Sequence, residues 1–191
     1  MDHSTLQADG TDNSAPDSES WHQVAQTPGL GEPIGTIKEL SGGVTVTHTD
    51  GVIEQGVQGA PVYLNDTVAT SLDGAVEIVF IDGMAFSLGG NAEMDLNNLV
   101  YNPGGADNAL DLSVVKGAFV FITGGIAPAE GEGVKIDTPA GTIGIRGTSG
   151  GGTQDPQSGN WVFSLFVDPN GHVGRIVITN AAGTVVLDEA L

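Results

Sequence analysis

The feature that most constrains the fold is an alternation of apolar and polar residues that starts at Ile34 and recurs along the chain. In "AVEIVFIDG" the residues Val76, Ile78 and Phe80 share one face, and "GGVTVTH" follows the same rule. Alternation carried by β-branched and aromatic residues is typical of strands with one buried face. No window sustains the i, i+3, i+4 stripe of a helix, so the pattern predicts an all-β protein.

Turn signals separate these runs at intervals typical of many short strands. Asp-Gly pairs stand at 50–51, 73–74 and 82–83, and an Asn-Gly pair stands at 170–171. Such pairs supply the positive φ that two-residue hairpin turns require. The 30 glycines among 191 residues fit the same design. We therefore predict one antiparallel, sandwich- or solenoid-like β-domain over residues 34–189.

The first 33 residues differ from the rest in composition. They contain no hydrophobic period and no lysine or arginine, but they do contain Asp2, Asp9, Asp12, Asp17, Glu19 and Glu32. This composition predicts a disordered acidic leader over residues 1–33. The leader lacks the positive and apolar regions of a secretory signal, so we expect either the cytosol or an export route independent of an N-terminal signal.

The charge of the chain limits the classes of partner that it can bind. The formal net charge is −19, with only five lysines and arginines. A surface this acidic repels phosphate backbones and anionic lipids, so we expect no nucleic-acid partner. No run reaches the ~18–20 apolar residues that span a bilayer, so we expect no membrane insertion. The absence of cysteine excludes disulfides and thiolate metal sites.

One stretch matches the sequence of a catalytic motif. "GTSGG" at 147–151 matches the G-x-S-x-G nucleophile elbow, and Asp168 and His172 follow Ser149 in the chain order of an α/β-hydrolase. An elbow needs a helix directly after the serine, and glycines at 150–152 disfavour a helix by about 1 kcal/mol each. The favoured interpretation is a flexible glycine loop after a strand, with no catalytic residue.

Metal and cofactor signals are weak. The four histidines (His3, His22, His48 and His172) are scattered singly, and "GTIGIRG" lacks the spacing of a dinucleotide fingerprint. "GGADNALDL" at 104–112 faintly resembles a calcium-binding nonapeptide but occurs once, whereas such sites need stacked copies. We expect no dedicated cofactor or metal site, and at most weak calcium binding.

Arg146 is the unusual residue of an otherwise apolar run. Ile143 and Ile145 alternate with Gly144, so Arg146 falls on the small-residue face or at the strand end. The preferred interpretation is structural: the guanidinium binds carbonyl groups and one carboxylate from a neighbouring turn, such as Asp82. A contact with a partner is the second interpretation.

The same run carries a family resemblance. "TPAGTIGIRGT" (138–148) resembles the signature strand of FecR-type domains, and "QGAPVYLNDTVATSLDG" and "LSVVKGAFVFITGGI" resemble their upstream elements. The resemblance extends over residues 34–187 and implies an all-β, non-enzymatic module. The residues that carry the signature are Thr138, Pro139, Gly141, Gly144, Arg146, Gly147 and Thr148.

The resemblance implies two settings. FecR domains of iron-siderophore signalling lie in the periplasm, contact an outer-membrane receptor and regulate a sigma factor. The chain also resembles N-terminal modules of large bacterial surface proteins exported by type I secretion, and residues 34–96 resemble the retention modules of giant adhesins, which hold the protein in an outer-membrane pore. In those modules a periplasmic protease cuts a di-alanine motif, so Ala181-Ala182-Gly183 is a candidate cleavage site. A turn in the last hairpin is the alternative.

The leading functional expectation combines these points. We expect a non-catalytic interaction and anchoring module of a secreted or cell-surface protein, with an outer-membrane or secretion-channel protein as partner. A periplasmic FecR-like sensor is the second hypothesis. A serine hydrolase that uses Ser149 is the third.

Overall fold

The computed structural model describes residues 31–105, 107–126, 133–168 and 171–189. Within those ranges the regular structure consists of strands alone, as the sequence predicts. The predicted leader, residues 1–33, lies almost entirely outside the described residues. The strands are β1 (Gly35–Ser41), β2 (Val44–Thr47), β3 (Ile53–Gln55), β4 (Pro61–Val62), β5 (Thr67–Thr70), β6 (Ala75–Phe80), β7 (Ala85–Leu88), β8 (Glu93–Val100), β9 (Ala109–Lys116), β10 (Ala118–Ile122), β11 (Val134–Thr138), β12 (Gly141–Arg146), β13 (Ser149–Gln154), β14 (Trp161–Phe166), β15 (Arg175–Asn180) and β16 (Gly183–Leu187).

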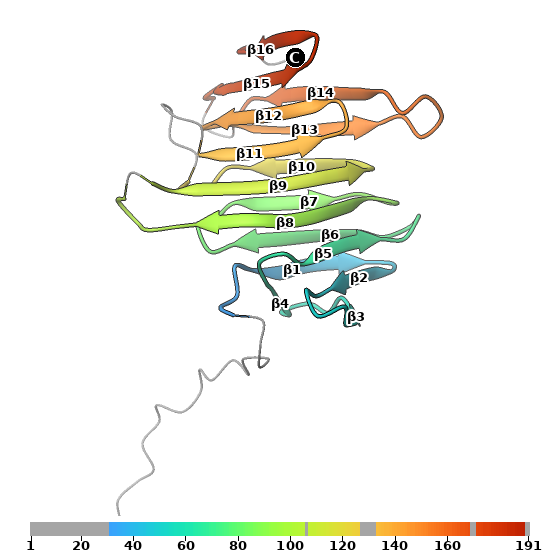
Figure 1. Cartoon of the computed structure of the whole chain (residues 1–191). Coiled ribbons are helices and arrows are strands. Elements are labelled where there is room, and N and C mark those ends of the chain that lie inside the picture. Colours follow the sequence, from blue (N-terminus) through green and yellow to red (C-terminus); the bar gives the residue numbers. More distant parts are fainter. Residues whose placement is uncertain (1–30, 106, 127–132, 169–170, 190–191) are drawn as a thin grey trace, which may run out of the picture.

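The strands form two sheets that face each other. One sheet has the order β14-β13-β10-β7-β6-β1-β4, and the other has the order β16-β15-β12-β11-β9-β8-β5-β2-β3. The chain passes back and forth between the sheets as it advances, so strands that are close in sequence lie at the same level (Figure 1). The fold is therefore both a sandwich and a solenoid. Among the described residues, every strand pair is antiparallel except that of β9 with β11.

The hydrophobic core lies between the two sheets. In β6, Val76, Ile78 and Phe80 are buried while the intervening residues are only partly covered, which confirms the predicted alternation. One cluster of buried side chains runs through both sheets from Ile34 to Ile176. Burial of apolar surface stabilises a fold by about 25 cal/mol per Å², so this cluster is the main stabilising feature of the molecule.

Two of the four turn signals close hairpins, as predicted, but the loops between the bonded pairs His48–Val52 and Phe80–Met84 have three residues rather than two. Gly51 (φ 84°) lies between β2 and β3, and Gly83 (φ 86°) lies between β6 and β7. The prediction is wrong for Gly74, because β5 and β6, which flank it, belong to different sheets. The signal at 170–171 lies between β14 and β15, which also belong to different sheets; residue 170 is outside the described residues. A turn signal marks where the chain reverses, and it does not specify which strands pair.

The predicted glycine loop is also corrected. Residues Ser149–Gln154 form strand β13, which lies between β10 and β14 in the first sheet. Gly152 stands directly between Phe119 of β10 and Phe163 of β14, and both rings lie where its side chain would be. Aromatic rings that cover a strand glycine replace the packing that its missing side chain does not provide. The glycine run is thus a close-packed strand.

Candidate functional site

The signature strand begins at a tight turn between β11 and β12. The Thr138 hydroxyl donates to the Gly141 carbonyl oxygen at 2.9 Å, and the Ala140 amide donates to that hydroxyl at 3.3 Å. Gly141 has φ 148°, and a Cβ there would lie 2.6 Å from the Thr179 carbonyl oxygen of β15. Pro139 lies inside this turn, where its fixed φ favours a reversal.

Successive side chains of the signature strand β12 point to opposite faces of the sheet. Ile143 and Ile145 are buried in the core, and their cross-strand partners in β15 are isoleucines as well. Gly144 and Arg146 alternate with them and therefore face away from the core. Arg146 is also the last residue of β12, so the structure places it both on the face of Gly144 and at the strand end, the two positions that the sequence left open.

The strand ends where the chain crosses from one sheet to the other. Gly147 takes φ 51°, and Thr148 follows it with only 1% of its surface exposed. The Gly174 amide donates to the Thr148 hydroxyl at 3.3 Å. A Cβ on Gly174 would lie 2.3 Å from the Arg146 carbonyl oxygen, so only glycine fits there. The chain therefore crosses between the sheets at the Arg-Gly-Thr end of the signature, and contacts with the backbone of Gly174 hold this segment in place.

Arg146 lies directly opposite Arg175 in the β12–β15 pair. The two arginines line one open cavity of about 290 Å³, together with His172, Val173, Gly174 and Asp188. Arg175 forms an ion pair with Asp188 at 3.5 Å.

Asp82 has a different role from the one expected. Its carboxylate accepts hydrogen bonds from the Met84 amide at 3.0 Å and from the Ile126 amide at 3.2 Å. These contacts shape the turn after β6 and hold the chain that follows β10. The structure therefore assigns Asp82 to its own turn rather than to Arg146.

The nucleophile-elbow hypothesis does not match the geometry. Ser149 is the first residue of β13, so a strand follows it where an elbow needs a helix. Its hydroxyl donates to Asp168 Oδ1 at 2.5 Å. In a triad the histidine stands between the serine and the acid, whereas here the acid binds the serine directly. The Ser149–Asp168 bond instead ties the end of β14 to the start of β13.

Ala181 and Ala182 form the exposed turn of the β15–β16 hairpin, as the alternative interpretation predicted. The Ala182 amide donates to Asn180 Oδ1 at 2.9 Å, and the Asn180 side-chain amide donates to the Ala140 carbonyl oxygen at 2.9 Å. Gly183 completes the turn with φ 137°. The di-alanine pair is accessible, and its flanking residues are hydrogen-bonded. Cleavage there stays a prediction.

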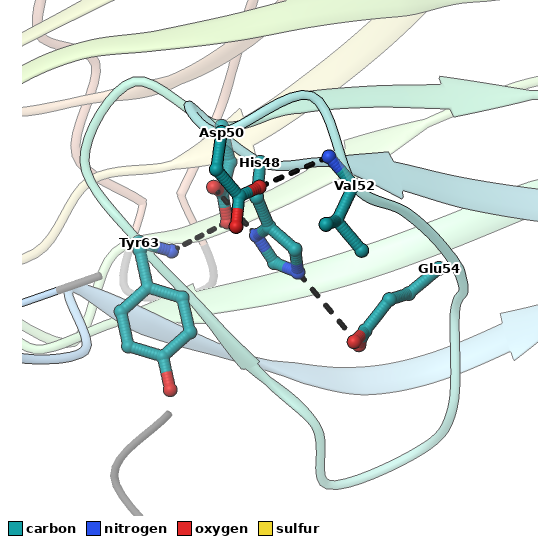
Figure 2. Close-up of polar contacts among 6 residues, drawn as sticks. His48, Asp50, Val52, Glu54 and Tyr63 are labelled. Carbon is teal, nitrogen blue, oxygen red and sulfur yellow. Dashed lines mark hydrogen bonds and ion pairs between the residues drawn. The ribbon is translucent and has the colours of Figure 1, made fainter. Parts of the chain in front are cut away.

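A buried polar cluster, which sequence reasoning missed, lies beside β2 and β3, at the end of the stack opposite β16 (Figure 1). Figure 2 shows this cluster in close-up. His48 Nδ1 lies 2.8 Å from Asp66 Oδ1, and both side chains are buried. The second carboxylate oxygen of Asp66 accepts the Tyr63 amide at 2.8 Å. Glu54 Oε2 lies 3.7 Å from His48 Nε2, and the Tyr63 ring meets the imidazole edge to face at 5.9 Å.

The stretch "YLND" explains how this cluster forms. Asn65 takes a left-handed φ of 64°, which turns the chain so that Asp66 points inward. The Leu96 carbonyl oxygen accepts the Asn65 amide at 2.6 Å and the Asp66 carbonyl oxygen accepts the Leu96 amide at 3.0 Å, which fixes the turn to β8. Asp66 therefore joins the β2–β3 loop to the turn before β5.

The electrostatics of the cluster follow from its burial. Burial lowers the pKa of His48, but the hydrogen bond and charge of Asp66, with a smaller contribution from Glu54, outweigh it and raise the pKa above 6.5. Burial raises the pKa of Asp66 above 3.8, although its bonds to His48 and to the Tyr63 amide oppose the rise. The contacts with Asp66 and Glu54 therefore favour the charged imidazolium.

We therefore predict that the stability of the fold depends on pH through His48. A raised folded-state pKa means that the stabilisation is complete below the unfolded value near 6.5 and is lost as pH rises through the folded value. The free energy of unfolding, measured by urea titration between pH 5.5 and 8.5, should fall with rising pH. His48→Gln should flatten that dependence, and an equal slope in both proteins would contradict the prediction.

The described residues hold no group of three or more His, Cys, Asp or Glu side chains placed to bind a metal ion. Calcium binding stays a prediction. No helix in the described part of the chain is long and apolar enough to span a membrane.

These features define the class of protein: an all-β, two-sheet module in which the chain crosses from one sheet to the other directly after the signature strand β12. The FecR protein family model matches residues 66–164, just over half of the chain. The chain belongs to that family, and the resemblance drawn from residues 138–148 is confirmed.

The search of the curated proteins found no match. One solved structure, described as a cell surface anchoring domain, is 36% identical over 33% of this chain and 83% of its own, with a TM-score of 0.32.

Proposed function

We propose that this chain is a non-catalytic interaction and anchoring module at a bacterial cell surface. The FecR family match supports a binding module, and the position of Ser149 in a strand gives no support to a hydrolase. The observation that carries the proposal is the contrast between the two ends of the solenoid.

The C-terminal end presents two edge strands without charges. β14 reads WVFSLF and β16 reads GTVVL, and in the described residues each strand pairs on one side only. Figure 1 shows both strands at the end of the stack where the chain finishes. The exposed apolar side chains there are Val162, Phe166, Val167, Val185 and Val186. In a chain with a net charge of −19, an edge free of charge is unusual.

The N-terminal end is built differently. β3 has three residues and includes Glu54, and β4 has two residues and includes Pro61. Short strands, charges and proline are the devices by which proteins prevent edge-to-edge pairing. They protect one end of the solenoid, while the other end keeps longer apolar edges.

The occupant that fits the C-terminal end is a β-strand from a partner protein. An extended segment gains main-chain hydrogen bonds from an unpaired strand, and alternate side chains provide the apolar contacts. The partner is an outer-membrane or secretion-channel protein, and strand addition anchors the module to it. The module acts at the cell surface, and type I secretion is the export route that we propose for the protein that carries it.

A site-specific crosslink tests this proposal. We place a photo-crosslinking amino acid at Val162 of β14, and at Ile53 of β3 in a control; the two side chains are 68% and 66% exposed. After illumination of intact cells, Val162 should yield a defined adduct with an envelope protein, and Ile53 should not. Phe166→Lys, which adds a charge to the same edge strand β14, should abolish the adduct. Equal adducts at both positions, or none at Val162, would contradict the proposal.

The periplasmic sensor is the second candidate function, because the family match supports it equally. Immunoblots of cell fractions separate the two. The anchoring module belongs in the outer membrane or the medium within a large polypeptide, and the sensor belongs in the periplasm. If the outer-membrane form is found, Ala181-Ala182 becomes a protease substrate to be tested.

A further inference from the structure

The outer face of the first sheet is almost free of charge. The described strands β6, β7, β10, β13 and β14 contain one charged residue among them, Glu77. The second sheet shows the usual arrangement for a side that faces solvent, because its register places Asp95, Ser113 and Asp137 in one outward row. In a chain with a net charge of −19, a sheet face almost without charge points to contact with another molecule.

The outward side chains of β6, β7 and β10 form the part of this surface that we call the β7 face. In cross-strand order they are Val79, Ala85 and Ile122 in one row and Glu77, Ser87 and Val120 in the next. Val120 and Ile122 are 45% and 53% exposed, whereas β7 contributes only the small residues Ala85 and Ser87. The surface is therefore low over β7 and higher over its two neighbours.

The β7 face has the width of an α-helix. Neighbouring strands lie about 4.8 Å apart, so β6 and β10 are about 10 Å apart across β7. An α-helix with its side chains is about 10–12 Å in diameter. A helix aligned with β7 therefore rests on Ala85 between Val79 and Ile122. An added strand does not fit there, because β7 already pairs with β6 on one side and with β10 on the other.

An acidic groove adjoins the β7 face. The groove measures about 240 Å³, and its lining includes Glu39 of β1, Glu77 of β6 and Ser87 of β7, with Leu40 and Leu88 as apolar wall. Glu39 and Glu77 are cross-strand partners, and like charges in that position destabilise a strand pair. Within the described residues neither carboxylate forms an ion pair. A lysine or arginine that lays its apolar stem along Leu40 would meet both carboxylates.

We propose that the β7 face binds an amphipathic α-helix of a partner protein, which places apolar side chains on Val120 and Ile122 and a lysine or arginine in the groove beside Glu77. Recognition of this kind uses apolar residues spaced i, i+3, i+4 and i+7 on the partner helix. The net charge of −19 attracts a basic segment over a long range. The interaction uses a sheet face, whereas strand addition at β14 uses a sheet edge, so each can fail without the other.

An NMR titration of the full chain with three capped peptides tests the proposal. Each peptide has about 15 residues, the length at which isolated helices become stable in water. The first carries leucines on one helical face with lysines beside them, the second has glutamate in place of lysine, and the third rearranges the first so that leucines alternate with polar residues. The first should cause saturable shifts at the amides of Ser87, Val120 and Ile122. The glutamate peptide should bind about tenfold or more weakly, because the chain repels it, and the alternating peptide should cause no saturable shifts at those amides.

Matched variants localise the binding. Val120→Thr replaces one methyl group of the β7 face by a hydroxyl and should weaken the affinity of the first peptide about fourfold. Val115→Thr on β9 of the second sheet is the control and should leave affinity unchanged, since Val115 is 41% exposed and Val120 is 45% exposed. Glu77→Gln should weaken affinity about threefold, whereas Glu93→Gln on β8 should leave it nearly unchanged. Equal affinities within either pair of variants, equal binding of the helical and alternating peptides, or no saturable shifts with the first peptide would overturn the proposal.

Discussion

Gly152→Ala should lower the free energy of unfolding by about 2–3 kcal/mol, the upper part of the range expected for overpacking a filled core. A Cβ at Gly152 would lie 2.7 Å from Phe119 Cε1 and 2.8 Å from Phe163 Cδ1. The Phe119 ring has no room to retreat, because it stacks on Phe86 at 5.5 Å and contacts Trp161 at 6.1 Å. The measurement is urea unfolding followed by tryptophan fluorescence.

The matched control is Gly89→Ala at the end of β7. A Cβ there would make an ordinary contact with the Ala118 Cβ at 3.5 Å. Replacing glycine by alanine at a compatible site restricts the unfolded chain and stabilises a protein by about 0.4–1 kcal/mol. The two variants should thus shift stability in opposite directions. Adding Phe163→Leu to Gly152→Ala should recover part of the loss, and a Gly152 variant as stable as the Gly89 variant would contradict the packing argument.

This glycine strand shows where sequence reasoning reached its limit. Alternation located β6 and β12 correctly, because each strand carries its own apolar face. β13 carries no such face, and its burial is provided by rings from β10 and β14. A local pattern cannot reveal a strand whose packing residues all lie on its neighbours. The same limit explains Gly74, where the turn was found and the strand pairing was not.

The polar cluster escaped prediction for a related reason. His48 and Asp66 stand 18 positions apart, and each resembles an ordinary loop residue. One signal was available: the "Y-x-N-D" part of the resemblance holds an asparagine suited to positive φ directly before an aspartate, and Asn65 takes that conformation. Only the pairing of β2 with β5 brings the histidine to that aspartate.

Asp66→Asn should destabilise the fold by about 3 kcal/mol, the lower end of the loss expected when one partner of a buried ion pair is removed. Both carboxylate oxygens of Asp66 are used, one by the His48 imidazole and one by the Tyr63 amide, each at 2.8 Å. An asparagine offers one oxygen and one N–H₂ group, so one of these two donors meets another donor. The measurement is urea unfolding at pH 6, where the imidazole is charged in the folded state.

Glu54→Gln is the control within the same cluster, because Glu54 is the second acidic neighbour of His48. Its carboxylate lies 3.7 Å from the imidazole and is 62% exposed, so its loss should cost less than about 0.5 kcal/mol. The Asp66 variant should also lose the pH dependence attributed to His48, whereas the Glu54 variant should keep most of it. His48→Gln combined with Asp66→Asn should cost less than the sum of the single changes, because each removes the same contact. Equal losses in the Asp66 and Glu54 variants would mean that the buried pair does not hold the β2–β3 loop to β5.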